Sequence, residues 1–220
     1  MKYFVRRAPD FYDWGSGVFE IPTDPKVIEQ ESLRVWREKD YEEFLEMTSE
    51  QRREKLIAVQ TWLAECSETD RKCNLLLELA GFQCVDGKYE NAIAALDEYL
   101  KLKPDKDDAW YCRGIVLDEL GRTEEAIASY DRALEVKPDK DEAWNNRGLA
   151  LRKLGRYEDA IASYDRALEV NPDDDEAWYN RGYALDELGR YEDAIASYDR
   201  ALEVNPDDDE AWYNRGYALD

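Results

Sequence analysis

Apolar and small residues recur at a fixed spacing of 34 residues through the C-terminal two-thirds of the chain. A run of 24 residues, GRYEDAIASYDRALEVNPDDDEAW, occurs twice without change, beginning at Gly155 and at Gly189. The pair Ala-Trp recurs at the same interval, at Ala109-Trp110, Ala143-Trp144, Ala177-Trp178 and Ala211-Trp212. Self-similarity at a fixed period indicates a repeat architecture.

The repeat frame divides the chain into two predicted domains, residues 1–72 and residues 73–220. The second contains units at 73–106, 107–140, 141–174 and 175–208 and a partial unit at 209–220. The unit at 73–106 is divergent, because Leu76 replaces the recurring Trp and Ala80 replaces a recurring Gly. We expect this unit to connect the repeats to the segment that precedes them.

Each unit predicts two helices. In the unit 175–208 the first helix runs from Asp175, where acidic residues suit a helix start, to about Leu188, and Gly189 ends it. The second helix is predicted from one apolar stripe, made by Ala194, Ile195, Tyr198, Ala201 and Leu202. Asn205-Pro206 ends it. Since two helices cannot bury such a stripe alone, the units are expected to stack into an all-α solenoid.

The segment 1–72 shows no repeat. Residues 1–23 are aromatic-rich with turn signals, and Asp24-Pro25 predicts the start of a helix that continues to about Asp40. Thr48 and Gln51 form a capping-box pattern ahead of a helix to about Cys66. The apolar residues of that helix are expected to pack on the first repeat as an N-terminal helical cap, and they are Leu56, Val59, Trp62 and Leu63.

The repeated residues resemble the tetratricopeptide repeat (TPR) family, whose 34-residue pattern places residues of these types at fixed positions. The matching residues of one unit are Trp178, Gly182, Ala194, Tyr198, Ala201 and Pro206. The resemblance extends from Cys73 onward. It implies a right-handed superhelical solenoid of helix-turn-helix units, whose first helices line a concave groove that binds peptides or protein segments.

The two most similar units, 141–174 and 175–208, differ at only four positions: Asn145/Tyr179, Leu149/Tyr183, Arg152/Asp186 and Lys153/Glu187. The spacing places all four on one face of the first helix. Two of them reverse charge, which a buried face would not tolerate, so we expect an exposed stripe. The resemblance makes this stripe the groove face. The alternatives are drift on a solvated surface, or pairing of Arg152 and Lys153 with acids of neighbouring repeats such as Asp186 and Glu187.

Tyrosine and asparagine side chains would supply the contacts of the predicted groove. Tyrosine gives rigid amphipathic contact area, and asparagine offers a donor and an acceptor to a peptide backbone. Asn146, Asn180 and Asn214 could instead serve the neighbouring repeat. The predicted groove residues are Tyr111, Ile115, Asp118, Glu119, Asn145, Asn146, Leu149, Arg152, Lys153, Tyr179, Asn180, Tyr183, Asp186, Glu187, Tyr213, Asn214 and Tyr217.

Composition narrows the function. Among 220 residues there are 52 Asp and Glu against 30 Lys and Arg, a net charge of −22, and no histidine. The missing histidine excludes Ser-His-Asp and Cys-His catalysis and HExxH zinc sites. The acidity argues against nucleic acids and anionic membranes as partners. Some TPR proteins hold acidic C-terminal peptides with Lys and Arg, but this chain has acids at several such positions, so we expect a basic and aromatic or apolar partner.

No cofactor or metal is expected. The acidic runs 173–175 and 207–209 lack the ligand spacing of a calcium loop and suit helix capping instead. The four cysteines form no CxxC pair, and we interpret them as reduced, mostly buried thiols of a cytoplasmic protein. No apolar run reaches the length of a signal peptide or a membrane span.

The sequence therefore predicts a non-enzymatic scaffold for protein–protein interaction. One alternative is a structural module that self-assembles through residues 209–220, as a homo-dimer or end to end. Another is the TPR arm of a longer enzyme or signalling protein. A further possibility is that the N-terminal residues, which resemble the expected ligand, occupy the groove of the same or a neighbouring molecule; they are Lys2, Tyr3, Phe4, Arg6 and Arg7.

Overall fold

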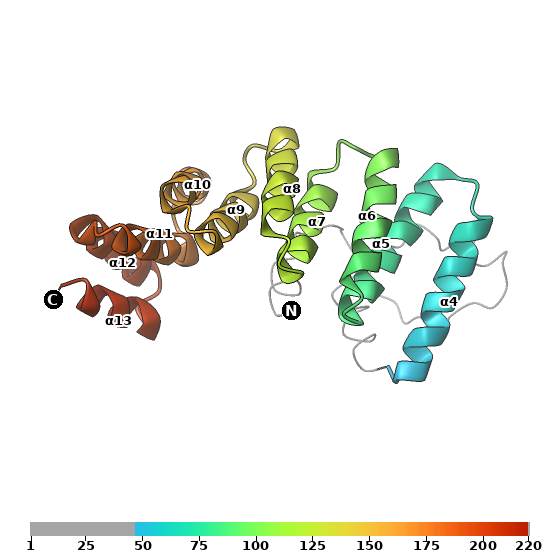
Figure 1. Ribbon diagram of the computed structural model, residues 1–220, viewed down its shortest axis with the longest axis horizontal. Helices are drawn as coiled ribbons and strands as arrows, with labels where there is room; N and C mark the ends of the chain where they lie inside the picture. Colours follow the sequence, from blue (N-terminus) through green and yellow to red (C-terminus); the bar gives the residue numbers. More distant parts are fainter. Residues whose placement is uncertain (1–46, 220) are drawn as a thin grey trace. The chain divides into compact units, whose positions relative to one another are not determined.

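The computed structural model describes residues 47–219 of the chain, and these form ten α-helices without a strand (Figure 1). The all-α prediction is confirmed for this part. The helices are α4 (Ser49–Glu65), α5 (Thr69–Val85), α6 (Tyr89–Leu102), α7 (Asp107–Glu119), α8 (Thr123–Val136), α9 (Asp141–Lys153), α10 (Tyr157–Val170), α11 (Asp175–Glu187), α12 (Tyr191–Val204) and α13 (Asp209–Tyr217). The helix predicted from Asp24 and the ligand-like residues near the N-terminus lie outside the described residues.

The described residues form two compact units, one ending at Ala109 and the other beginning at Trp110. In the first unit, α4 begins as predicted with a capping box. The backbone N–H of Gln51 donates to Thr48 Oγ1 at 3.3 Å, and that of Thr48 donates to Gln51 Oε1 at 2.8 Å. Helix α4 contacts α5 and buries Leu56 and Val59, so the predicted packing on the first repeat is confirmed for these two residues.

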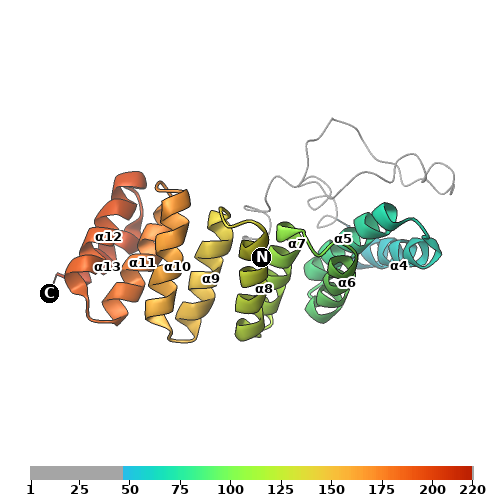
Figure 2. The same ribbon diagram turned by 90° about the horizontal axis from the view of Figure 1, so that it is seen from above.

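The second compact unit, which begins at Trp110, is a row of antiparallel helical hairpins (Figure 2). Within hairpins, α9 packs on α10 and α11 on α12. Between hairpins, α8 packs on α9, α10 on α11 and α12 on α13, so each second helix lies between two first helices. The hairpin turns contain Gly155 and Gly189 with φ of 71° and 70°, a left-handed conformation that glycine adopts without strain. The predicted solenoid of stacked two-helix units is confirmed.

In the hairpins α7–α8, α9–α10 and α11–α12, a glycine of the first helix packs against a tyrosine of the second. A Cβ atom at Gly148 would lie 2.5 Å from Cε1 of Tyr164, and one at Gly182 would lie 2.7 Å from the same atom of Tyr198. Both tyrosine side chains are fully buried. The contact is closer than any side chain larger than hydrogen allows, so the glycines set the distance between the two helices.

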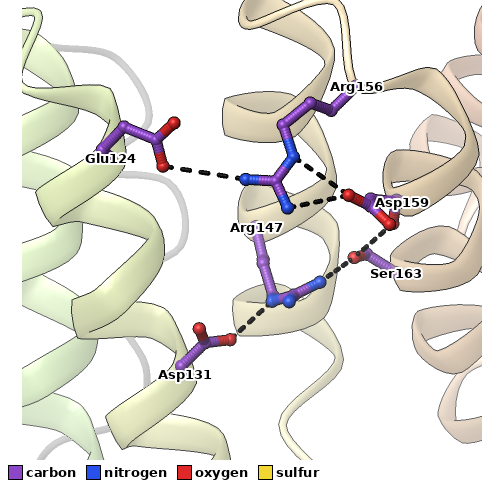
Figure 3. A network of polar contacts seen from close by, with 6 residues as sticks. All are labelled: Glu124, Asp131, Arg147, Arg156, Asp159 and Ser163. Carbon is purple, nitrogen blue, oxygen red and sulfur yellow. Dashed lines mark hydrogen bonds and ion pairs between the residues drawn. The ribbon is translucent and has the colours of Figure 1, made fainter.

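Arginine side chains join one hairpin to the next (Figure 3). Arg147 on α9 donates from Nε to Asp131 of α8 and from Nη1 to Ser163 of α10, both at 2.6 Å. Its guanidinium also stacks on Trp144, with Cζ 5.8 Å from the ring centroid. Arg156 pairs with Asp159 at 2.7 Å and approaches Glu124 at 3.7 Å. Charged hydrogen bonds of this kind fix the stacking of the units.

The acidic runs cap helices, as predicted. Asp174 Oδ1 accepts the backbone N–H of Ala177 at 3.1 Å, and Asp208 Oδ1 accepts those of Glu210 and Ala211 at 3.0 and 3.1 Å. No group of three potential metal ligands occurs within residues 47–219. None of the ten helices has the length and apolar character needed to cross a membrane.

The four cysteines are free. Cys73 and Cys84 are buried, and burial raises the pKa of the Cys84 thiol to about 12. Cys66 and Cys112 are half-buried, so burial of the thiols is less complete than expected.

Candidate functional site

The four positions that vary between the two similar repeats lie on one side of α9 and α11. We call this side, together with the equivalent positions of α7 and α13, the first-helix face. Lys153 and Glu187 are exposed there. The others are half-buried, except Asn145, which is buried; the half-buried ones are Leu149, Arg152, Tyr179, Tyr183 and Asp186. The face is therefore more enclosed than the exposed stripe that the charge reversals predict.

Asparagines on this face bond the neighbouring repeat. Asn146 Nδ2 donates to the hydroxyl of Tyr111 at 2.8 Å, and Asn214 Nδ2 donates to that of Tyr179 at 2.9 Å. Asn180 donates to Asn145 Oδ1 at 3.4 Å. The sequence leaves two roles open for these asparagines, contact with a bound peptide or bonding to the neighbouring repeat. In the structure they bond the neighbouring repeat.

Three predicted groove residues lie inside the solenoid. Tyr111, Asn145 and Asn180 are 2%, 1% and 4% exposed. They are covered because each takes part in a bond between adjacent first helices. We therefore do not expect these three side chains to reach a bound segment.

The two basic residues of α9 are engaged by neighbouring first helices. Lys153 Nζ donates to Asp118 Oδ2 of α7 at 2.6 Å, and the guanidinium of Arg152 lies over the ring of Tyr183 of α11, 4.7 Å from its centroid. Pairing with neighbouring repeats thus occurs, as the sequence allows. The residues contacted are Asp118 and Tyr183, whereas the sequence suggested Asp186 and Glu187.

Two carboxylates lie together at the C-terminal end of α11. Glu187 Oε2 accepts a hydrogen bond from the hydroxyl of Tyr157 at 3.1 Å, and interaction with Glu187 raises the pKa of Tyr183. Asp186 Oδ1 is buried without a hydrogen-bond partner. Burial raises the pKa of the Asp186 carboxyl, and the negative charge of Glu187 raises it further.

We expect Asp186→Asn to increase the free energy of unfolding at neutral pH. The folded-state pKa of Asp186 lies above its ordinary value of 3.8, so the ionised carboxylate opposes folding when pH is high. This opposition disappears as pH falls below 3.8, where the carboxyl is protonated in both states. Urea denaturation of parent and variant above and below that pH measures the difference, with Glu192→Gln on α12 as the control. A stability difference that does not change with pH would contradict a raised pKa of the Asp186 carboxyl.

Helix α13 exposes the largest aromatic surface of the described residues. Trp212, Tyr213, Tyr217 and Leu219 are 52%, 74%, 68% and 60% exposed. A Cβ at Gly216 would meet nothing within 4 Å, whereas its equivalents in the preceding hairpins meet a tyrosine ring. Of the remaining predicted residues, Ile115, Asp118, Asn146 and Asn214 are half-buried and Glu119 is exposed.

Tyr157 contacts the first-helix face, but a comparison of the repeats does not identify it. It lies at the start of α10, in a stretch that is identical in the next repeat, yet its hydroxyl bonds Glu187 on the first-helix face. Trp212 and Leu219 are outside the predicted groove residues, but both belong to residues 209–220, for which the sequence suggests self-assembly as an alternative, and both are exposed.

Most arginines and lysines of the second compact unit form ion pairs with acidic residues of the same unit. At least ten of them between residues 110 and 219 form ion pairs with aspartate or glutamate. Acids exceed bases in this part of the chain, so the unpaired charge is mostly negative.

Comparison with known proteins identifies the repeats. The tetratricopeptide repeat profile matches four overlapping stretches, residues 86–146, 114–169, 145–203 and 182–220, which together cover more than half of the chain. The chain belongs to the tetratricopeptide repeat family. It has the TPR scaffold fold, which is typical of protein–protein interaction. No curated protein matches the sequence significantly.

Solved TPR structures share the fold. MamA from Desulfovibrio magneticus RS-1 is similar with a TM-score of 0.63 and 23% identity, over 66% of this chain and 82% of that one. YrrB, a TPR protein with an unusual peptide-binding site, is similar with a TM-score of 0.63 and 21% identity, over 87% and 96%. The first TPR domain of Spaghetti (RPAP3), bound to the HSP90 peptide SRMEEVD, has a TM-score of 0.51 and 25% identity, over 52% and 90%.

Proposed function

We propose that this TPR protein is a non-enzymatic scaffold whose first-helix face binds a basic segment of another protein, rich in aromatic or apolar residues. One observation carries the proposal: two repeats that are otherwise identical differ only on this face. Drift on a solvated surface would also place substitutions on the exposed side of the second helices, and there are none.

The sign of the ligand charge follows from which charges are already paired. The arginines of the frame are bound to aspartates, as Arg147 is to Asp131 and Arg181 to Asp165. Asp186 and Glu187 have no basic partner among the described residues, so a positively charged segment is favoured. Association should weaken as ionic strength rises. In this respect the ligand differs from SRMEEVD, which carries more acidic than basic residues.

Exposed tyrosines of the first-helix face should contribute most to affinity. We expect Tyr217→Ala and Tyr213→Ala each to reduce binding to peptides selected from an array of basic and aromatic sequences by about tenfold or more, as is usual for interface tyrosines. Tyr191→Ala is the matched control, because Tyr191 is 50% exposed but lies on the second helix α12. Equal losses in all three variants, or none in the first two, would reject the assignment of this face.

A second candidate function is self-association through α13. The observation that favours it is the exposed apolar side of this helix, at the position where α9 and α11 are covered by α10 and α12. Burial of such a surface against a second copy would be favourable. Light scattering over a concentration series should then show a mass increase that Tyr217→Asp abolishes. A constant monomer mass would exclude this alternative.

A further inference from the structure

Helix α9 carries the basic residues of the first-helix face. Arg152 and Lys153 occupy the two positions at which both neighbouring first helices carry acids, namely Asp118 and Glu119 on α7 and Asp186 and Glu187 on α11. The side chains of Arg152 and Lys153 extend in opposite directions, one to α11 and the other to α7. Helix α9 thus contacts both neighbouring first helices through its own cationic groups.

Lys153 occupies the oxygen of Asp118 that an external cation could reach. Its ammonium donates to Asp118 Oδ2 at 2.6 Å. The other carboxylate oxygen, Oδ1, is buried without a hydrogen-bond partner, so a cation that approaches from solvent meets only Oδ2. The Lys153 side chain is 53% exposed and that of Asp118 is 18% exposed, so the lysine forms the outer side of the pair. An ammonium group of a bound segment would therefore compete with Lys153 for the same oxygen.

Arg152 covers a tyrosine ring of the same face. Its guanidinium Cζ lies 4.7 Å from the centroid of the Tyr183 ring on α11. A cation at this distance is attracted to the face of an aromatic ring. While Arg152 lies there, a basic or aromatic side chain of a bound segment cannot stack on that face of Tyr183. The two bases of α9 therefore make the two kinds of contact that a basic segment would make, an ammonium on a carboxylate and a guanidinium on an aromatic ring.

Other bonds hold these first helices together. Asn146 of α9 bonds Tyr111 of α7 at 2.8 Å, and Asn180 of α11 bonds Asn145 of α9 at 3.4 Å. Each of these bonds involves a buried side chain. An ion pair between partly exposed side chains contributes little to stability, so the outer contacts can open while the inner bonds keep the helices in place.

We propose that Arg152 and Lys153 are an intramolecular competitor, which a basic segment of the partner displaces when it binds the first-helix face. The inference rests on the proposed function, because it describes how occupation of that face is limited. Opening the exposed ion pair reduces affinity by a factor of up to about five, which corresponds to the contribution of such a pair. A segment with a base at this point replaces the opened contact and a neutral segment does not, so the competitor also favours basic over neutral segments.

Lys153→Met tests the competitor, because methionine retains much of the side-chain length and removes the ammonium. The probe is the tightest-binding nonapeptide from an array of basic and aromatic sequences, and its affinity for the full chain is measured by fluorescence anisotropy. Lys153→Met should bind it about two- to fivefold more tightly than the parent, since Oδ2 of Asp118 is then open. In the Asp118→Asn background the same substitution should leave the affinity unchanged, because the carboxylate for which lysine and ligand compete is absent.

Lys137→Met is the matched control. It removes the same charge from an exposed lysine that follows α8, outside the first-helix face, so a general effect of net charge would appear equally in both variants. The competitor is overturned if Lys153→Met does not tighten binding, if Lys137→Met tightens it as much, or if the gain persists in the Asp118→Asn background. In these cases a loss of binding in Tyr217→Ala still supports the proposed function. If neither the parent nor Lys153→Met binds any peptide of the array, both the competitor and the proposed function are rejected.

Discussion

Gly148→Ala is expected to destabilise the protein by about 1–3 kcal/mol, the usual cost of overpacking a core. The new Cβ would lie 2.5 Å from Cε1 of Tyr164, so the tyrosine ring or the helix has to move. Alanine is the better helix former by about 1 kcal/mol, and the expected loss is what remains after that gain. The midpoint of urea denaturation followed by circular dichroism measures it.

Gly216→Ala is the matched control, because it makes the same substitution at the same position of the repeat. Nothing lies within 4 Å of the Cβ that it would add. Only the gain in helix propensity remains, so stability should rise by up to about 1 kcal/mol. If the two variants shift the midpoint in the same direction by similar amounts, close packing between Gly148 and Tyr164 does not determine the stability of the hairpin.

Tyr164→Ala should cost about 3–5 kcal/mol, the range found when a large aromatic side chain is removed from a core. Tyr164 is fully buried between α9 and α10, and alanine would leave a cavity. Tyr164→Phe should be close to neutral or stabilising, since the hydroxyl is buried without a hydrogen-bond partner and phenylalanine removes it. Both are measured by urea denaturation.

Tyr213→Ala is the control for the tyrosine substitutions. This side chain is 74% exposed on α13, so its removal should change stability by no more than about 0.5 kcal/mol. A large loss in Tyr164→Phe would show that the hydroxyl has a stabilising role that its surroundings do not explain.

The frame of the fold could be predicted from sequence because each part of it depends on local chemistry. Gly189 ends the first helix with positive φ, and the stripe through Tyr198 and Ala201 is buried as its spacing indicates. The capping box at Thr48 also depends only on residues three positions apart. The glycine and the apolar stripe recur in successive repeats, so several repeats support one assignment.

The functional face was less predictable, because helical periodicity gives the direction of a side chain but not what covers it. Asn145 and Asn180 share a side of the helix with exposed positions, yet a neighbouring first helix buries them. Asn146 shows the physical reason: its partner, Tyr111, is 35 residues away, one more than the repeat. A bond of this kind depends on the stagger between units, which no single unit encodes.

Charge reversal was also an incomplete guide to exposure. Arg152 and Asp186 occupy the same unit position, and both are half-buried. Arginine is accommodated there by stacking on Tyr183, and aspartate keeps one carboxylate oxygen buried without a hydrogen-bond partner. The position therefore tolerates either sign because its outer side is open.

The bonds between units have a consequence for how the gene can change. They connect residues 35 or 16 positions apart, and the same pairs of positions recur in successive units. If residues 155–188 were duplicated in tandem, the added copy would find its bonding partners at both of its ends. Recombination between the identical stretches could thus lengthen or shorten the protein by whole units without redesign, and the number of recognition positions offered to a partner would change with each event.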